Sequence, residues 1–209
     1  MMSKIAVFLA PGFEEIEALT SVDYLRRAGQ EVVTVSVPGV DSSEITSVVP
    51  GAHGISVVTD QVLKDFADES EESLPDAVFF PGGLPGATNL AACEYLIDLI
   101  QFMEESGKLV AAMCASPAIV LSKSGVLAGR KWTCYPKMNE NLAEYCSSAE
   151  KAAELTKGSS VVEDVPFVFD KNVLTGRGPG TAEQFAMEFV RIIAGEAAAK
   201  KVHDGSCQR

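Results

Sequence analysis

Cys114 stands at the point where a short apolar run gives way to a helical pattern. Residues 109–113 are apolar, and Ser116 and Pro117 are typical of the N-cap and the first position of a helix. This order predicts a strand, a sharp turn and a helix, with Cys114 at the carboxyl end of a parallel strand, where open α/β sheets bind ligands. The positive end of the helix dipole would favour a nucleophilic thiolate there. The alternative is a small, buried core cysteine.

Two other strand ends carry groups that could act together with a thiol. Glu17 lies in the first turn of the first predicted helix, and Gly82 and Gly83 follow the apolar run 77–80. Because the carboxyl ends of parallel strands share one edge of a sheet, these groups can converge on Cys114. A protonated carboxyl would donate a hydrogen bond to a thiolate, and an ionised carboxylate would take the proton of a thiol. The alternative for Glu17 is a first-turn glutamate that the helix dipole stabilises. The alternative for the two glycines is a plain tight turn.

The other thiols form no metal-binding pattern. The five cysteines contain no CxxC and no zinc spacing, and the glycine-rich loop is no dinucleotide fingerprint, so we expect reduced thiols, no metal and no cofactor. Packing is the simplest role for the four cysteines other than Cys114, which are Cys93, Cys134, Cys146 and Cys207.

Strand-like and helix-like segments alternate along the chain. Apolar and β-branched runs predict strands at residues 5–9, 31–37, 55–58, 77–80, 109–113, 131–134 and 172–175, with a hairpin region near 161–169. Helical periodicity appears after Cys114 and at residues 14–28, 61–66, 87–105, 142–155 and 182–194. This alternation predicts one doubly wound α/β domain over residues 1–195, followed by a polar tail, 196–209, that frays.

Charge and hydropathy exclude several classes of function. The 209 residues carry a net charge of −12, which argues against a nucleic-acid footprint and against adhesion to anionic membranes. No apolar stretch approaches the ~20 residues of a membrane span, and we expect no leader before the first strand. We therefore expect a cytoplasmic protein without nucleic-acid or membrane partners.

Five short segments form a pattern that runs through most of the chain. They are FLAPGFEEIE (8–17), RRAG (26–29), PGG (81–83), AAMCA (111–115) and RGPGT (177–181). Together they resemble the DJ-one/ThiJ/PfpI superfamily, most closely the branch of the Parkinson's-linked protein deglycase and its bacterial relatives. The resemblance implies a flavodoxin-like three-layer sandwich with a mainly parallel sheet, a cysteine nucleophile elbow and a homodimer. Arg27 matches a family arginine near the dimer contact; the alternative is an exposed arginine at a helix end.

The resemblance also implies roles for individual residues. Cys114 matches the reactive cysteine, and Glu17 matches the acid that touches its sulfur. The main-chain N–H groups of Gly83 and Ala115, beside Gly82, become candidate oxyanion or substrate-binding donors.

One position departs from the family pattern. Many members of the branch have a histidine before a proline where this chain has Tyr135 before Pro136. The two histidines, His53 and His203, lie in a glycine-flanked loop and in the tail, so a Cys–His dyad has no obvious partner. Tyr135 could orient a substrate through its hydroxyl, or it could be a packed ring with a solvated tip.

Two functions remain open at this point. The first is cofactor-free glyoxalase or deglycase chemistry, in which Cys114 attacks methylglyoxal, glyoxal or an early glycation adduct and Glu17 moves protons. The second is a redox-sensing stress protein or chaperone that works through oxidation of Cys114 to sulfinic acid. Both functions need the same residues, so the sequence does not separate them.

Overall fold

A seven-stranded sheet forms the centre of the protein. The computed structural model describes residues 2–40, 46–70 and 73–208. In spatial order the strands are β10 (Phe167–Asp170), β11 (Val173–Gly176), β7 (Leu109–Met113), β6 (Ala77–Phe80), β1 (Lys4–Leu9), β2 (Glu31–Ser36) and β5 (Gln61–Val62). All neighbouring pairs are parallel except β10 and β11. The predicted flavodoxin-like α/β sandwich with a mainly parallel sheet is confirmed.

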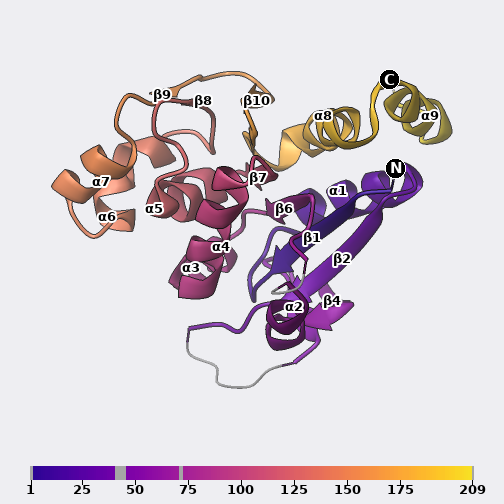
Figure 1. Ribbon diagram of the computed structural model, residues 1–209, viewed down its shortest axis with the longest axis horizontal. Coiled ribbons are helices and arrows are strands. Elements are labelled where there is room, and N and C mark those ends of the chain that lie inside the picture. Colours follow the sequence, from indigo (N-terminus) through magenta and orange to yellow (C-terminus); the bar gives the residue numbers. More distant parts are fainter. Residues whose placement is uncertain (1, 41–45, 71–72, 209) are drawn as a thin grey trace.

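Helices cover both faces of this sheet (Figure 1). On one face α1 (Glu15–Arg27) packs against α8 (Ala182–Ala194), and on the other lie α2 (Leu63–Ser70), α3 (Gly86–Ala92) and α4 (Glu94–Glu105). Because both faces are covered, the central strands are apolar along their length rather than alternating, and every residue of β6 and β7 is buried. These continuous apolar runs are the reason why the sequence predicts the central strands well.

Several connections differ from the sequence-based expectation. The helix expected over residues 87–105 is two helices, because Cys93 between α3 and α4 is extended. The expected hairpin near 161–169 is wrong: β9 (Ser160–Val161) pairs in parallel with β8 (Lys131–Trp132), and β10 pairs with β11. The remaining short elements are β3 (Val48–Pro50), β4 (Ser56–Val58), η1 (Pro117–Leu121), α5 (Ser122–Ser124), η2 (Met138–Asn141), α6 (Leu142–Tyr145), α7 (Ala149–Leu155) and η3 (Pro179–Thr181).

We expected the C-terminal segment to fray, but it is ordered. It forms α9 (Glu196–Gly205), which packs against α8 and buries Ala199 and Val202 (Figure 1). Beyond it, the Gln208 side chain donates a hydrogen bond to the Tyr24 hydroxyl of α1 at 3.2 Å. The expectation was wrong because the two buried side chains are small and three residues apart, a weak helical stripe in an otherwise polar segment.

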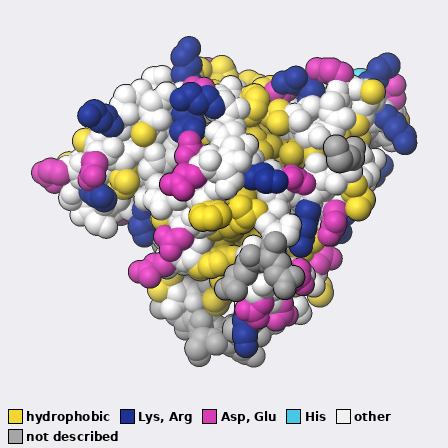
Figure 2. Space-filling view, viewed as in Figure 1, with side chains coloured by type: hydrophobic (Ala, Val, Ile, Leu, Met, Phe, Trp, Pro, Cys, Tyr) yellow, Lys and Arg dark blue, Asp and Glu magenta, His cyan; other side chains and the backbone are white. Residues whose placement is uncertain are grey.

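The described surface shows charges of both signs. On the face shown in Figure 2, Lys and Arg side chains are interspersed with Asp and Glu side chains, and hydrophobic side chains gather near its centre. Within the described ranges, no helix combines the length and the apolar character needed to cross a bilayer.

Candidate active site

Cys114 occupies a strained backbone position directly after β7. Its φ angle is 61°, in the left-handed region that side chains other than glycine rarely adopt. The Cys114 N–H donates to the Gly176 carbonyl oxygen at 2.9 Å, and the Tyr135 N–H donates to the Cys114 carbonyl oxygen at 2.8 Å. These two bonds hold the turn between β11 and the segment after β8, which is how a strained conformation persists at a candidate site.

The segment after Cys114 differs from the predicted capped helix. Ser116 is already helical and does not cap; its hydroxyl donates to the Pro81 carbonyl oxygen at 2.6 Å. The helix that follows consists of the five-residue π-helical η1 and the three-residue α5. Such a short, irregular helix contributes less dipole than the sequence suggested. The Ser116 bond instead ties the Cys114 turn to the loop after β6.

Glu17 lies behind the cysteine, completely buried on the first turns of α1. Its Oε2 accepts a hydrogen bond from the Gly82 N–H at 2.7 Å, and the Cys114 thiol is a second hydrogen-bonding neighbour of the carboxyl. Its Oε1 is buried without a nitrogen or oxygen donor in the described part of the chain. Burial raises the pKa of Glu17 to about 7, so this carboxyl can hold or release a proton near neutral pH.

The thiol of Cys114 titrates together with this carboxyl. Burial raises the pKa of the Cys114 thiol, and negative charge on Glu17 raises it further, whereas the N–H groups of Gly83 and Ala115 act in the opposite direction. Our expectation that the turn alone favours a thiolate was therefore incomplete, because it missed the burial and the adjacent carboxylate. The thiolate is favoured when Glu17 carries the proton, since the pair then holds one negative charge instead of two.

The two glycines of the loop after β6 have different positions. A Cβ on Gly82 would lie 2.6 Å from the Cβ of Cys114 and 2.8 Å from Oε2 of Glu17, so only a glycine permits this contact. Because the Gly82 N–H is bonded to Glu17, it is not available to a substrate. Gly83 has a φ of 88°, and its N–H reaches the Cys114 sulfur together with the Ala115 N–H.

A cavity of about 780 Å³ opens over the cysteine. Its lining residues include Cys114, Ala115, Gly83 and Tyr135, so four of the residues chosen from the sequence meet there, while Glu17 lies beneath the cavity wall. The rest of the lining is contributed by Glu14, Glu15, Ile16, Ala52, His53, Ile55, Leu84, Met138 and Pro179.

Arg27 and His203 lie away from this cavity and from the residues beneath it. Arg27 is exposed in the last turn of α1, where it forms an ion pair with Asp23. His203 lies on α9 beside Asp204.

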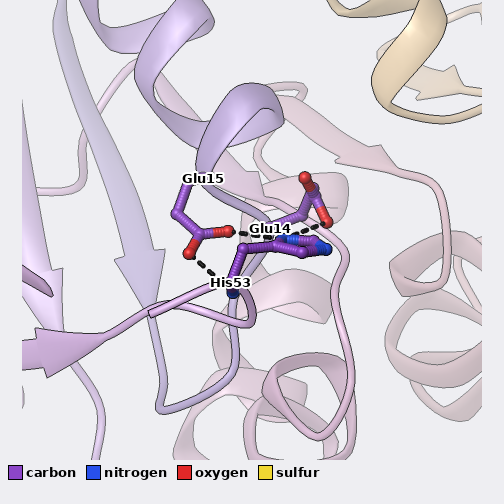
Figure 3. A group of neighbouring side chains, drawn as sticks. All are labelled: Glu14, Glu15 and His53. Carbon is purple, nitrogen blue, oxygen red and sulfur yellow. Dashed lines mark hydrogen bonds and ion pairs between the residues drawn. The ribbon is translucent and has the colours of Figure 1, made fainter. Parts of the chain in front are cut away.

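His53 lines the cavity, although no partner for it could be recognised in the sequence. It lies in the turn between β3 and β4, and the Ala52 N–H in that turn donates to the Phe13 carbonyl oxygen at 2.8 Å. This bond places the turn against the start of α1. Figure 3 shows the His53 imidazole beside two carboxylates, with Nδ1 2.9 Å from Oε2 of Glu15 and 3.5 Å from Oε2 of Glu14.

The Glu15 carboxylate fixes both the backbone and the ring of His53. Oε1 accepts hydrogen bonds from the main-chain N–H groups of His53 at 2.7 Å and Ile55 at 3.3 Å. Burial acts to raise the pKa of Glu15, but its hydrogen bonds with His53 and Ile55 outweigh it and bring this pKa to about 2. The hydrogen bond to Glu15, with the charges of Glu14 and Glu15, raises the pKa of His53.

Three features define the class of protein: a mainly parallel α/β sandwich, a cysteine with a left-handed backbone conformation after a central strand, and a buried glutamate beside that cysteine. The chain belongs to the DJ-1/PfpI family, whose model matches residues 3–192. The resemblance found in the sequence is thereby confirmed.

Individual relatives agree with this assignment. The chain is 36% identical over 205 residues to Protein dj-1beta of Drosophila melanogaster, covering 98% of this chain and 97% of the relative. The crystal structure of that protein superposes with a TM-score of 0.84 at 32% identity and full coverage of both chains. Glutathione-independent glyoxalase DJR-1.2 of Caenorhabditis elegans is 31% identical over 194 residues, which cover 92% of this chain and 90% of the relative. Protein DJ-1 homolog B of Arabidopsis thaliana is 34% identical over 202 residues, 95% of this chain, but the chain spans only 40% of that longer protein.

Proposed function

We propose that the protein is a cofactor-independent, cysteine-dependent glyoxalase or deglycase acting on methylglyoxal, glyoxal or early glycation adducts. The observation that carries this proposal is the contact between the Cys114 thiol and a buried carboxyl, Glu17, with a pKa near neutrality, beneath an open cavity. A carboxyl with this pKa is suited to accept and release protons at the pH of the cell. The similarity to a relative named as a glutathione-independent glyoxalase supports the reaction class.

The first step is addition of the Cys114 sulfur to the aldehyde carbon. A carbon–sulfur bond forms, the π bond of the carbonyl breaks, and the thiol proton passes to the Glu17 carboxylate. The carbonyl oxygen takes up a proton and becomes the hydroxyl of a hemithioacetal. The N–H groups of Gly83 and Ala115 lie at the sulfur, within the site where the oxygen becomes negative, and support the oxyanion. With an early glycation adduct, the same sulfur displaces the amine from the carbinol carbon.

The second step is an internal rearrangement that needs no external oxidant. With its pKa near 7, Glu17 releases the thiol proton again and then removes a proton from the carbon bonded to sulfur. Return of this proton to the neighbouring carbon, with transfer of the hemithioacetal hydroxyl proton to the ketone oxygen, converts the hemithioacetal into a 2-hydroxy thioester, in which one carbon is oxidised and the other reduced. Water cleaves the carbon–sulfur bond, releasing the hydroxy acid and regenerating the Cys114 thiol.

The decisive experiment measures lactate formation from methylglyoxal without glutathione. Wild-type protein should turn over, and Cys114→Ser should not, because the serine hydroxyl is a much weaker nucleophile than the thiol. Glu17→Gln should lower kcat by about 10²- to 10⁴-fold, the range for loss of a general acid–base group. Turnover retained by Cys114→Ser would refute the mechanism.

Oxidation sensing is a second candidate function, and one observation favours it. A protonated Glu17 next to the Cys114 sulfur, with the Gly83 and Ala115 N–H groups, offers three donors to the oxygens of a sulfinate. Mild peroxide should then add two oxygen atoms to Cys114 before any other cysteine, as measured by mass spectrometry of peptides. Oxidation of the exposed Cys207 ahead of Cys114 would count against this function.

We also propose that the protein is a cytoplasmic homodimer. All five cysteines are free thiols, which supports a reducing compartment. Large apolar side chains are exposed at the start of α1 and on the β3–β4 hairpin, among them Ile16, Ile55 and Val58, and this supports association through that side. Sedimentation equilibrium should give twice the 22.1 kDa mass of the chain, and a monomer would contradict the proposal.

A further inference from the structure

The mechanism above assigns no role to His53, an ionisable residue that lines the cavity. The side chain of His53 is 68% exposed, and the residue contributes to the cavity that contains Cys114. Within the part of the chain that the structure describes, it is the one cavity-lining side chain that can carry positive charge, because the lining contains neither lysine nor arginine. The group is therefore placed to interact with a bound carbonyl compound.

The two ring nitrogens of His53 have different surroundings. Nδ1 is bound to Glu15 (Figure 3), while Nε2 has no hydrogen-bond partner among the described residues. A carboxylate on Nδ1 fixes the orientation of an imidazole and stabilises its protonated form, leaving the N–H of Nε2 free to act on another molecule. Glu15 also accepts a hydrogen bond from the His53 main-chain N–H, so the same carboxylate positions both the backbone and the ring of His53.

We propose that His53 donates the Nε2 proton to the carbonyl oxygen of the substrate while Cys114 adds to the carbonyl carbon. The inference rests on the proposed function, because it concerns the same cavity. The sulfur–carbon bond forms as the carbonyl π bond breaks; the oxygen receives the proton of His53, and the Cys114 proton goes to Glu17. His53 regains its proton from solvent, to which it is exposed. Glu15 is a positioning residue in this scheme, because it acts through the imidazole.

The groups that face His53 favour its protonated state. Glu14 and Glu15 face it from the start of α1, and Cys114 and Tyr135 are the other titratable groups that line the cavity, with Glu17 beneath them. The nearest charges are thus negative, which agrees with the raised pKa of His53. The donor is present below this raised pKa and is lost as the pH rises through it, so the rate should fall on the alkaline side.

The test compares the pH dependence of kcat and KM for methylglyoxal in four proteins. His53→Gln, which cannot donate a proton as an acid, should lower kcat by about 10²-fold at pH 7 and remove the alkaline decline assigned to His53. Glu15→Gln keeps an oxygen for the main-chain N–H groups but loses the charge, and it should move that decline to lower pH. His203→Gln, at the second histidine of the chain, should behave as wild type.

A second measurement separates this inference from the proposed function. Rapid quenching and mass spectrometry give the rate at which methylglyoxal forms an adduct on Cys114, whether or not turnover follows. An adduct that forms about 10-fold or more slowly in His53→Gln than in wild type supports His53 as the donor, even if no lactate appears. Equal adduct rates, or an unchanged pH profile of kcat, overturn the inference and leave the proposed function intact. Absence of any Cys114 adduct in the wild type overturns both.

Discussion

The main-chain N–H of Tyr135 donates a hydrogen bond to the carbonyl oxygen of Cys114 at 2.8 Å. The cysteine turn thus holds the backbone of Tyr135, while the tyrosine ring, half exposed, lines the cavity. Because the tie is made by backbone atoms, it does not depend on the side chain at this position. The backbone position of Tyr135 is therefore set independently of its ring, and the tyrosine hydroxyl has no hydrogen-bond partner within the described segments.

Removal of that hydroxyl should weaken substrate binding without slowing the chemistry. We expect Tyr135→Phe to raise KM about 5-fold, equivalent to about 1 kcal/mol for one hydrogen bond, with kcat unchanged. Steady-state kinetics with methylglyoxal measures both constants. Tyr24→Phe, outside the cavity, is the matched control. An unchanged KM in Tyr135→Phe would show that the ring only packs.

The buried Glu17 should make folding stability depend on pH. Its ordinary pKa is 4.5 and its folded-state pKa is about 7, so between these values the unfolded chain loses a proton that the folded chain keeps. Stability from this group is full below about pH 4.5 and falls as the pH rises toward 7. Glu17→Gln should therefore be more stable than wild type at pH 8, by about 1–3 kcal/mol, and similar at pH 4.5.

Urea unfolding at pH 4.5 and pH 8 measures this difference. Glu31→Gln, at an exposed position on β2, controls for the loss of one carboxylate from an acidic chain. The same change in stability in both variants would contradict the assignment to Glu17.

The contact of Gly82 with the reactive pair should tolerate no side chain. A methyl group at Gly82 would overlap the Cβ of Cys114 and Oε2 of Glu17, and it would push the two apart. We expect Gly82→Ala to reduce kcat/KM at least as far as Glu17→Gln does and to destabilise the fold by about 1–3 kcal/mol. At Gly180 a Cβ would have no neighbour within 4 Å, so Gly180→Ala should leave both properties unchanged. Wild-type activity in Gly82→Ala would contradict the close packing.

The packing of α9 should contribute to global stability. Val202 is 2% exposed on this helix, and Val202→Ala removes two buried carbon atoms, so we expect a loss of about 1–2 kcal/mol. Lys201→Ala, at an exposed position on the same helix, should have little effect. Thermal unfolding monitored by circular dichroism compares the two, and a stable Val202→Ala protein would mean that α9 opens independently of the domain.

The central strands and the cysteine turn could be predicted from the sequence because they depend on local patterns. A parallel strand covered on both faces must be apolar, as β6 and β7 are throughout and as β1 is after Lys4, and a run that stops at Cys114 before Pro117 marks the turn. The positions of Glu17 and the two glycines followed from the rule that parallel strand ends share one edge.

Features that depend on long-range packing could not be predicted. Glu15 and His53 are 38 residues apart in sequence, and they meet because the turn before β4 pairs with Phe13. The titration of Cys114 depends on how deeply Glu17 is buried, which no local pattern reports. Ser116 shows the converse error: its type suggested a helix cap, but a carbonyl oxygen of the neighbouring loop was a closer partner.

The left-handed backbone of Cys114 has a consequence for engineering. A residue other than glycine at a φ of 61° is disfavoured by about 1 kcal/mol or more, and glycine would relieve this strain while deleting the sulfur. A library screened for heat resistance alone should therefore accumulate Cys114→Gly. Directed evolution of a more thermostable variant therefore needs a simultaneous screen for thiol-dependent activity, because at this position selection for stability and selection for activity favour different amino acids.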